Sequence, residues 1–209
     1  MRPGPTIIRK CSACFKLIQQ RTLGSGNTFG ATHWTDGKLQ AYMLPDRPLL
    51  VMCPHCHVPL WIDELEKLGV VGPWGDEEGQ FKDARRYETP SLDDYFALLA
   101  IGVGEPKKER CVRVRAWWAG NDKRRAPGAS EMPITSREAA NILALALTLD
   151  ESDARDLLMK AEAMRELGRF DDTLSLLAKS ADAGTAQAVE IIRSLSEKRD
   201  PYVRAMRFK

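Results

Sequence analysis

The spacing of apolar residues changes along the chain and divides it into two regions. Before about residue 75 the apolar runs are short and are interrupted by glycine and other turn residues, which is typical of strands. Asp36-Gly37 is a favoured hairpin turn and separates two of these runs. We therefore predict a small β-rich region. The segments expected to form its strands are 6–9, 15–18, 32–34, 38–42 and 49–52.

Beyond residue 90 the apolar residues recur at helical spacing, and cap-forming residues stand at the boundaries. Ser91 with Asp94, and Thr135 with Glu138, are capping-box patterns that precede apolar runs. Gly168 follows an apolar run at a position where helices commonly end. These signals predict an all-helical region. Its expected helices are 91–103, 106–120, 136–149, 150–167, 170–183 and 185–199.

The two patterns together predict an α+β protein with two domains. A polar stretch rich in glycine and acidic residues at 72–79 is a candidate linker. We place a β-rich domain at 1–75, a linker at 76–89 and a helical domain at 90–209. The helix at 136–149 is apolar on nearly every face, so we expect it to be buried at the centre of the helical domain.

Composition narrows the classes of function. The 209 residues carry 31 basic and 29 acidic side chains, a net charge of +2, which predicts neither a strong nucleic-acid footprint nor a polybasic membrane anchor. No apolar stretch approaches the length of about 20 residues that spans a bilayer. The N-terminus, MRPGPTIIRKC, lacks the apolar region of a secretory signal. We therefore expect a cytoplasmic protein without a membrane partner.

Four of the five cysteines form two C-x2-C pairs. Cys11 and Cys14 make the first pair and Cys53 and Cys56 the second, with 38 residues between them (53 − 14 − 1). A C-x2-C turn points both sulfurs to one side, and two such turns supply the four thiolates of a closed structural zinc site. In a chain without an export signal this pattern favours metal binding over disulfides. The sequence therefore predicts one structural Zn²⁺ per chain.

The main alternative to a metal site is a set of four ordinary buried cysteines. Histidines near the cysteine pairs are also possible ligands. We interpret His33, His55 and His57 as bystanders, with His57 as the best substitute if one cysteine does not ligate. Cys111 lies apart from the pairs, and we interpret it as a buried core thiol rather than a ligand or a nucleophile.

Residues 6–62 resemble the zinc-ribbon and rubredoxin-like families through these two cysteine pairs. The resemblance implies a small β fold around one metal ion with four sulfur ligands. Families of this kind often have glycine immediately after the second cysteine of each pair, whereas this chain has Phe15 and His57 there. Rubredoxins hold iron for electron transfer. The long segment between the pairs and the missing glycines favour zinc here.

Residues 154–184 resemble one tetratricopeptide repeat, a helix–turn–helix unit. Ala161 matches its small residue, Gly168 its turn glycine and Phe170 the aromatic residue that opens its second helix. Thr173 stands where alanine is usual, and an ordinary helix pair is the alternative interpretation. The resemblance implies a short stack of helices that presents a surface to another protein. Leu157, Leu174 and Leu177 are the expected packing residues.

Two further segments could bind a ligand. The glycine-rich segment 24–30 resembles a phosphate-binding loop, but it lacks the Gly-Lys-Ser/Thr ending and following helix of a P-loop, so a structural loop is the favoured interpretation. A recognition loop over 24–34 is the alternative, because Asn27, Phe29, His33 and Trp34 are concentrated there. The basic segment 107–125 contains Trp117 and Trp118 and could bind nucleic acid. Cys111, Val114 and Trp118 fall on one helical face, however, and we expect that face to pack in the core with the arginines exposed.

These observations favour a non-enzymatic protein, since no catalytic motif is recognisable and four thiolates leave zinc no open position. Our leading hypothesis is an interaction or adaptor module that binds another protein through its helical domain. The alternative is a nucleic-acid-binding zinc-ribbon protein that uses segment 107–125. The combination of a four-cysteine ribbon with a repeat-like helical domain resembles that of some uncharacterised bacterial proteins, which implies an architecture without an activity.

Overall fold

The computed structural model describes residues 1–74, 79–126, 131–180 and 182–208. The chain forms two compact units. The first consists of Met1–Ala31 and Gln40–Asp94, and the second of Thr32–Leu39 and Tyr95–Lys209. The first unit is rich in strands and carries the paired cysteines, whereas the second is predominantly helical. The predicted α+β class is therefore confirmed.

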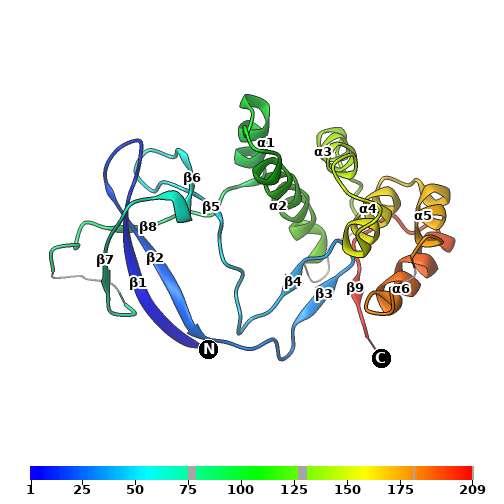
Figure 1. Cartoon of the computed structure of the whole chain (residues 1–209), viewed down its shortest axis with the longest axis horizontal. Coiled ribbons are helices and arrows are strands. Elements are labelled where there is room, and N and C mark those ends of the chain that lie inside the picture. The colour runs from blue at the N-terminus through cyan, green and yellow to red at the C-terminus, as the bar shows by residue number, and fades with distance from the viewer. Residues whose placement is uncertain (75–78, 127–130, 181, 209) are drawn as a thin grey trace. The chain divides into compact units, whose positions relative to one another are not determined.

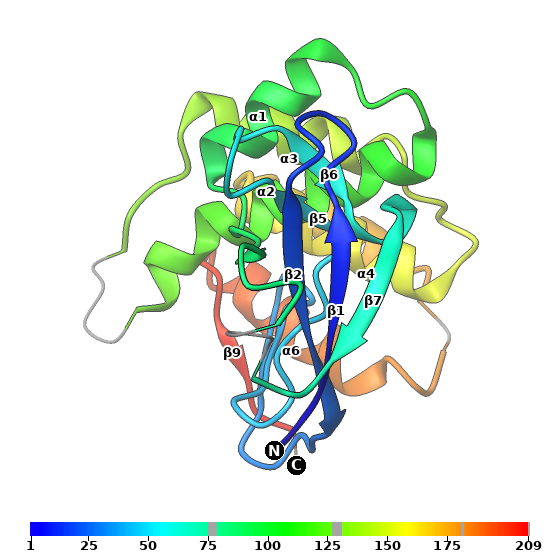
Figure 2. The same ribbon diagram turned by 90° about the vertical axis from the view of Figure 1, so that its left-hand side faces the viewer.

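The first unit is built on an antiparallel pair of nine-residue strands, β1 (Arg2–Lys10) and β2 (Leu17–Ser25). Strand β7 (Lys67–Val71) pairs with the free edge of β1, and the two-residue strand β8 (Arg85–Arg86) pairs in parallel with β2. The order of this sheet is β7-β1-β2-β8, and Figure 2 shows its three long strands side by side.

A second, smaller hairpin completes the first unit. Strands β5 (Leu50–Met52) and β6 (Pro59–Trp61) are antiparallel and lead into a single 3₁₀ turn, η1 (Ile62–Glu64). The apolar side chains of both hairpins meet in one small core that includes two of the paired cysteines. Its buried members are Cys11, Ile18, Val51, Cys53, Leu60, Ile62 and Leu65.

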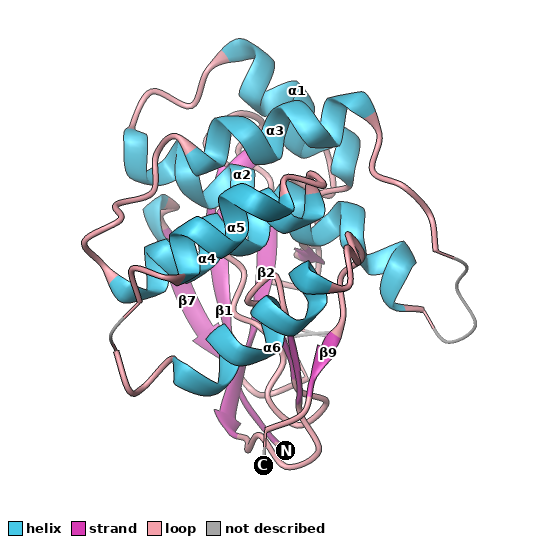
Figure 3. Cartoon of the chain, turned by 90° about the vertical axis from the view of Figure 1, so that its right-hand side faces the viewer, coloured by secondary structure: helices cyan, strands magenta, loops and turns pink. Residues whose placement is uncertain are grey.

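The second unit contains six α-helices among its described residues, α1 starting at the boundary between the units (Figures 1 and 3). Each helix from α2 to α6 is in contact with the next one. The capping boxes predicted at Ser91 and Thr135 are both present. The helices are α1 (Leu92–Ile101), α2 (Pro106–Arg125), α3 (Ser136–Ala146), α4 (Ala154–Glu166), α5 (Phe170–Leu177) and α6 (Ala186–Glu197).

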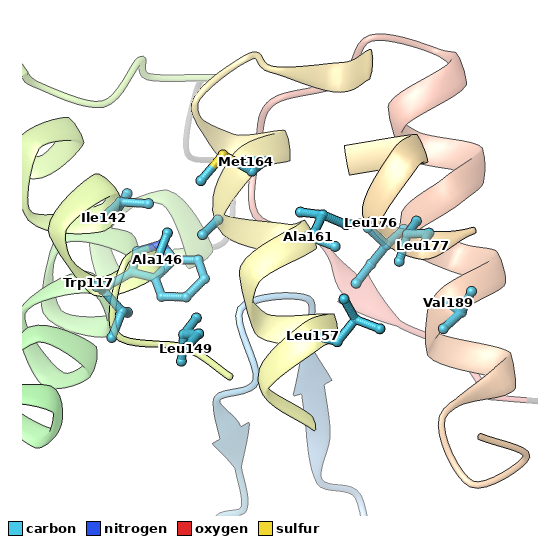
Figure 4. Packing of buried hydrophobic residues seen from close by; sticks show 13 residues of the cluster. Trp117, Ile142, Ala146, Leu149, Leu157, Ala161, Met164, Leu176, Leu177 and Val189 are labelled. Atoms are coloured by element: carbon cyan, nitrogen blue, oxygen red, sulfur yellow. The ribbon is translucent and has the colours of Figure 1, made fainter. Parts of the chain in front are cut away.

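Helix α4 lies at the centre of the second unit. Figure 4 shows its side chains between residues of α2 and α3 on one side and residues of α5 and α6 on the other. The predicted central helix, 136–149, is instead packed mainly on α2 and α4, and one of its faces is open. Leu143 and Leu147 are 42% and 79% exposed. The prediction of burial on every face was therefore wrong.

Helix α2 differs from its prediction in length and in its buried face. Gly120, expected to end the helix, lies inside it. Glycine is required at this position because a side chain would collide with the Glu138 carboxylate of α3. Val112, Ala116 and Trp117 are buried, whereas the predicted stripe of Cys111, Val114 and Trp118 is only partly buried. The core face is rotated because the Trp117 indole is directed into the cluster around α4.

Residues 32–39 form a hairpin that belongs to the second unit, although the chain before it and after it belongs to the first unit. Its strands are β3 (Thr32–Trp34) and β4 (Leu39–Gln40), and β3 also pairs with the C-terminal strand β9 (Ala205–Met206). The predicted turn at Asp36-Gly37 is present, with Gly37 at a φ of 80°. The segment from Thr32 to Leu39 therefore lies outside the β-rich unit to which the sequence assigned it.

A buried polar network holds this hairpin against the helices. The Asp36 carboxylate accepts a hydrogen bond of 3.0 Å from Asn121 Nδ2 and forms an ion pair with Arg125, both on α2. The Arg165 guanidinium of α4 donates two hydrogen bonds, of 2.6 and 2.8 Å, to Glu162 and a third to the carbonyl oxygen of Tyr202. These contacts join segments that are up to 166 residues apart (202 − 36) in a single buried network.

Helices α4 and α5 form the predicted helix–turn–helix. Gly168 lies between them with a φ of 74°, which favours glycine, and Phe170 is the first residue of α5. Ala161 is fully buried, and Thr173 Oγ1 donates to its carbonyl oxygen at 3.2 Å. This contact indicates the close helix approach expected at Ala161. That the pair is a tetratricopeptide repeat stays a prediction.

The region expected to be a linker is only partly described. Residues 76–78 lie outside the described residues, whereas 79–89 belong to the first unit and contribute β8 to its sheet. The part of the sequence covered by the structure contains no helix long and apolar enough to cross a membrane.

Candidate metal centre

Each cysteine pair forms the same tight turn. In the first, Cys11 N donates to the Lys16 carbonyl oxygen at 2.9 Å and Phe15 N donates to the Cys11 carbonyl oxygen at 3.0 Å. The second pair repeats both hydrogen bonds at 3.0 Å: Cys53 N donates to the Val58 carbonyl oxygen, and His57 N donates to the Cys53 carbonyl oxygen. This shared backbone pattern brings the second cysteine of each pair back towards the first.

Phe15 and His57 adopt left-handed backbone conformations, with φ values of 62° and 55°. These are the two positions at which related turns have glycine. A residue with a Cβ atom disfavours this region by about 1–2 kcal/mol. The chain thus builds both turns with a non-glycine residue in the left-handed conformation.

The four thiols converge on one point. Their sulfur atoms all lie within 4.8 Å of one another. Cys11 Sγ lies 3.9 Å from Cys56 Sγ, and Cys14 Sγ lies 3.7 Å from Cys53 Sγ. Zn–S bonds of about 2.3 Å in a tetrahedron place sulfurs about 3.8 Å apart. A disulfide needs an S–S distance of about 2.05 Å, so the arrangement fits a metal ion and not a pair of cross-links.

Burial and backbone amides act on these thiols in opposite directions. Burial alone would raise the pKa of Cys11, but the amides of Cys14 and Ala13, each 3.4 Å from its sulfur, lower that pKa to about 7. For Cys53, burial raises the pKa to about 12, and the nearby thiols of Cys56 and Cys11 add to the increase. Four ionised thiols can therefore share this site only with a cation to neutralise them.

The histidines make contacts away from the sulfur cluster. His55 Nε2 lies 3.0 Å from the carbonyl oxygen of Leu17, and His57 Nδ1 lies 3.2 Å from a Glu88 carboxylate oxygen. In the second unit, the His33 ring packs edge-on against Phe208 at a centroid distance of 5.3 Å. Cys111 lies on α2, partly buried, rather than in the fully buried position predicted for it.

The glycine-rich segment 24–34 does not form one loop. Residues 24–31 belong to the first unit and 32–34 to the second, where they form β3. Within the loop, Phe29 N donates to the Asn27 side chain at 3.0 Å, a local turn contact, and the Phe29 ring is exposed. No helix directly follows the segment in the described residues, since strands β4 and β5 come next, and this is consistent with the structural interpretation of the loop.

The basic segment 107–125 is largely neutralised by carboxylates of its own unit. Arg124 pairs with Glu138 at 2.9 Å, and both side chains are more than 90% buried. Burial would raise the pKa of Glu138, but the Arg124 guanidinium and the Thr135 amide lower it to about 2. The prediction that the arginines are exposed was wrong for this part of α2. Further pairs are Lys108–Glu105, Arg110–Asp156, Arg113–Glu109, Arg125–Asp36 and Arg125–Asp122.

Sequence reasoning did not identify the buried network of Asp36, Glu162, Arg165 and Glu166. Glu166 accepts hydrogen bonds from Trp117 Nε1 at 2.8 Å and from Asn121 Nδ2 at 3.1 Å. Burial raises the Glu166 pKa well above its usual value, and Glu162 and Asp36 add to the increase. The i, i+3 spacing of Glu162 and Arg165 was visible in the sequence, but it is equally common on exposed helix faces.

Comparison with protein-family models, curated proteins and solved structures finds no match to this chain. The resemblances to zinc ribbons and to a tetratricopeptide repeat therefore rest on the residues themselves. The geometry defines the class of site: a cluster of four cysteine sulfurs, two from each hairpin turn, positioned to hold one metal ion.

Proposed function

We propose that this protein is a non-enzymatic adaptor in which one Zn²⁺ organises the β-rich unit and the helical unit binds another protein. The observation that carries the metal assignment is the convergence of the four sulfurs, which all lie within 4.8 Å of one another. Thiolates in this geometry suit Zn²⁺, and four of them fill its coordination sphere. An ion without an open position has a structural role, and reduced thiolate ligands suit the cytoplasm.

Zinc supplies a cross-link between two hairpin turns that are distant in the sequence. Cys11 and Cys14 lie at the β1–β2 turn, and Cys53 and Cys56 follow β5. The apolar core between these hairpins is small, and metal binding contributes on the order of 10–16 kcal/mol in comparable sites. The ion would therefore decide whether the two hairpins stay together.

Charge pairing favours a protein over nucleic acid as the partner. Nucleic-acid binding requires lysines and arginines that are available to phosphates. Arg110, Arg113, Arg124 and Arg125 are instead engaged with carboxylates of the same unit, and Arg125 is almost fully buried. By contrast, α3 exposes Leu143 and Leu147 on one face, and exposed apolar side chains of this kind suit a protein contact.

Elemental analysis and sulfur-ligand X-ray absorption of the purified full-length chain test the metal assignment. We expect one zinc per chain with four sulfur neighbours. Cys53→Ser should lose most of the zinc, whereas the control Cys111→Ser should retain it. A folded protein without metal, or one that takes up iron from a zinc-replete medium, would contradict the proposal.

A binding titration separates the two classes of partner. Mixed-sequence duplex DNA and single-stranded RNA, titrated at low and high salt, should show no sub-micromolar affinity. If such binding occurs, is lost at high salt and is abolished by Lys107→Glu with Lys123→Glu, two exposed positions of the basic segment, then nucleic acid is the partner.

A further inference from the structure

A groove crosses the surface of the second unit between α3, α4 and α5. It encloses about 310 Å³, which is the size of a site for a few aliphatic side chains. Its apolar lining comes from three helices: Leu143, Ala146 and Leu147 from α3 and its end, Met164 from α4 and Leu176 from α5. Leu157, Phe170 and Leu177 do not line the groove, because they are buried in the core.

Two leucine side chains that line the groove are exposed to water. The Leu147 side chain is 79% exposed and Leu143 is 42% exposed, and they lie one helical turn apart on α3. Leucines at this spacing present two adjacent apolar contacts to anything that lies along the groove. The described strands of this unit, at 32–34, 39–40 and 205–206, do not contribute to the groove, so it offers no strand edge for β-addition. A helix laid into the groove is therefore the fitting form of ligand.

One end of the groove carries an excess of positive charge. Lys160 Nζ and Lys179 Nζ lie 2.8 and 2.7 Å from the two oxygens of one carboxylate, that of Glu151. These two ammonium groups lower the Glu151 pKa to about 2. Two cations that share one anion leave a net charge of +1 at this end, whereas Arg169, at the other end of α5, is paired with Asp172. An acidic residue of a ligand would neutralise the remaining positive charge of Lys160 and Lys179.

Charge also distinguishes between a second copy of the chain and a different protein. The second unit has 21 basic and 18 acidic side chains, a net charge of +3 (21 − 18). Two such units would repel each other, whereas an acidic partner would be attracted. From the leucine pair, the groove and the shared carboxylate we infer that α3, α4 and α5 bind an acidic amphipathic helix of another protein. This inference rests on the adaptor function proposed above and specifies the partner's chemistry.

The test uses the full-length, zinc-loaded chain and a designed helical peptide as the probe. The peptide carries leucines at i, i+4 and i+7 and glutamates beside them, and a second peptide replaces each glutamate with lysine. Fluorescence anisotropy should report binding of the acidic peptide at least tenfold tighter than that of the basic one. Equal affinities for the two peptides, or no binding of either at about 100 μM, would overturn the inference.

Matched variants locate the binding to the groove. Leu147→Lys should weaken the acidic peptide at least tenfold, whereas Ile101→Lys, at a position 80% exposed in the same unit but outside the groove, should not change its affinity. Lys179→Glu should weaken the acidic peptide and strengthen the basic one. Equal losses in Leu147→Lys and Ile101→Lys would mean that binding is non-specific.

Two further outcomes separate this inference from the adaptor function itself. Concentration-dependent dimers that Leu147→Lys abolishes would assign the groove to a second copy of the chain and contradict an acidic partner. If a protein cross-linked to the native chain in cells is still bound by Leu147→Lys, the groove assignment fails while the adaptor function stands. If the wild-type chain cross-links to no protein, the adaptor function fails.

Discussion

Each of the two units buries a group of acidic side chains, but the negative charge is neutralised from different sources. In the first unit four thiols lie within 4.8 Å of one another, next to an apolar core that supplies no cation. In the second unit Asp36, Glu162 and Glu166 are buried together with Arg125 and Arg165, so that the chain provides its own counter-charges. If the cluster binds Zn²⁺ as proposed, the first unit would depend on an ion taken from solution, whereas the second unit supplies arginines beside its buried carboxylates.

This difference predicts different responses to the loss of neutralising charge. A structural zinc ion contributes on the order of 10–16 kcal/mol to a small domain. A buried ion pair contributes little net stability, because desolvation offsets the attraction, yet removal of one partner costs about 3–5 kcal/mol. Metal removal should thus unfold one unit completely, whereas loss of one arginine should only weaken the other.

The largest expected effect is that of metal removal from the full-length chain. Chelation should expose the amides of β1, β2, β5 and β6 to hydrogen exchange, because the proposed ion supplies most of the free energy that joins the two hairpins. Residues 32–39 should keep their protection although they lie between the two cysteine pairs, because Asp36 is held by Asn121 and Arg125. Mass spectrometry of hydrogen exchange before and after chelation measures both regions.

Cys111→Ser is the control for this experiment and should respond to chelation as the wild-type chain does. Loss of protection at 32–39 together with 6–20 would mean that the hairpin follows the metal centre, and the proposed independence of the second unit would be incorrect. Retention of protection throughout would mean that the apolar core of the first unit suffices without metal.

A smaller effect is expected from the buried pair of the second unit. Arg165→Met leaves Glu162 and Glu166 without their cation and should lower the free energy of unfolding of this unit by about 3–5 kcal/mol. Arg193→Met is a matched control, because Arg193 pairs with Glu190 at the same helical spacing but on the surface. That change should cost less than about 1 kcal/mol.

Urea unfolding followed by helical circular dichroism distinguishes the two variants. The double variant Arg165→Met with Glu162→Leu should recover part of the loss, because it removes an anion together with its cation. Equal losses of unfolding free energy in Arg165→Met and Arg193→Met would show that burial of the ion pair does not increase the cost of removing its arginine.

The sequence predicted the clustering of the four cysteines and most helices because both depend on local signals. A C-x2-C turn is complete within six residues, and the capping boxes at Ser91 and Thr135 act across a single turn. Strands β6 and β7 were not predicted, because Pro59 begins the first and Gly69 interrupts the second, and both residues disfavour a strand interpretation.

What the sequence could not predict is long-range. The membership of Thr32–Leu39 in the second unit depends on contacts with α2, α4 and residues beyond 200, which no local pattern encodes. Gly120 was interpreted as a helix end because glycine terminates helices far more often than it accommodates a carboxylate from a neighbouring helix. The open face of α3 likewise depends on how many helices pack around it.

The smallest expected effect concerns the backbone of the cysteine turns. Phe15 has a φ of 62° and its side chain is 67% exposed, so the strained conformation is not offset by burial of the ring. Phe15→Gly removes the steric cost of about 1–2 kcal/mol but increases the entropy of the unfolded chain by about 0.4–1 kcal/mol. We expect a net gain of about 1 kcal/mol or less, measured as tighter zinc retention against a competing chelator.

Lys16→Gly is the control for this prediction. Lys16 lies one residue further along and has no positive φ to relieve, so the change should instead loosen zinc retention slightly. If Phe15→Gly also loosens it, the aromatic side chain contributes a contact that outweighs the strain. The Lys10 ammonium, 5.6 Å from the centre of the ring, would then be the interaction to examine.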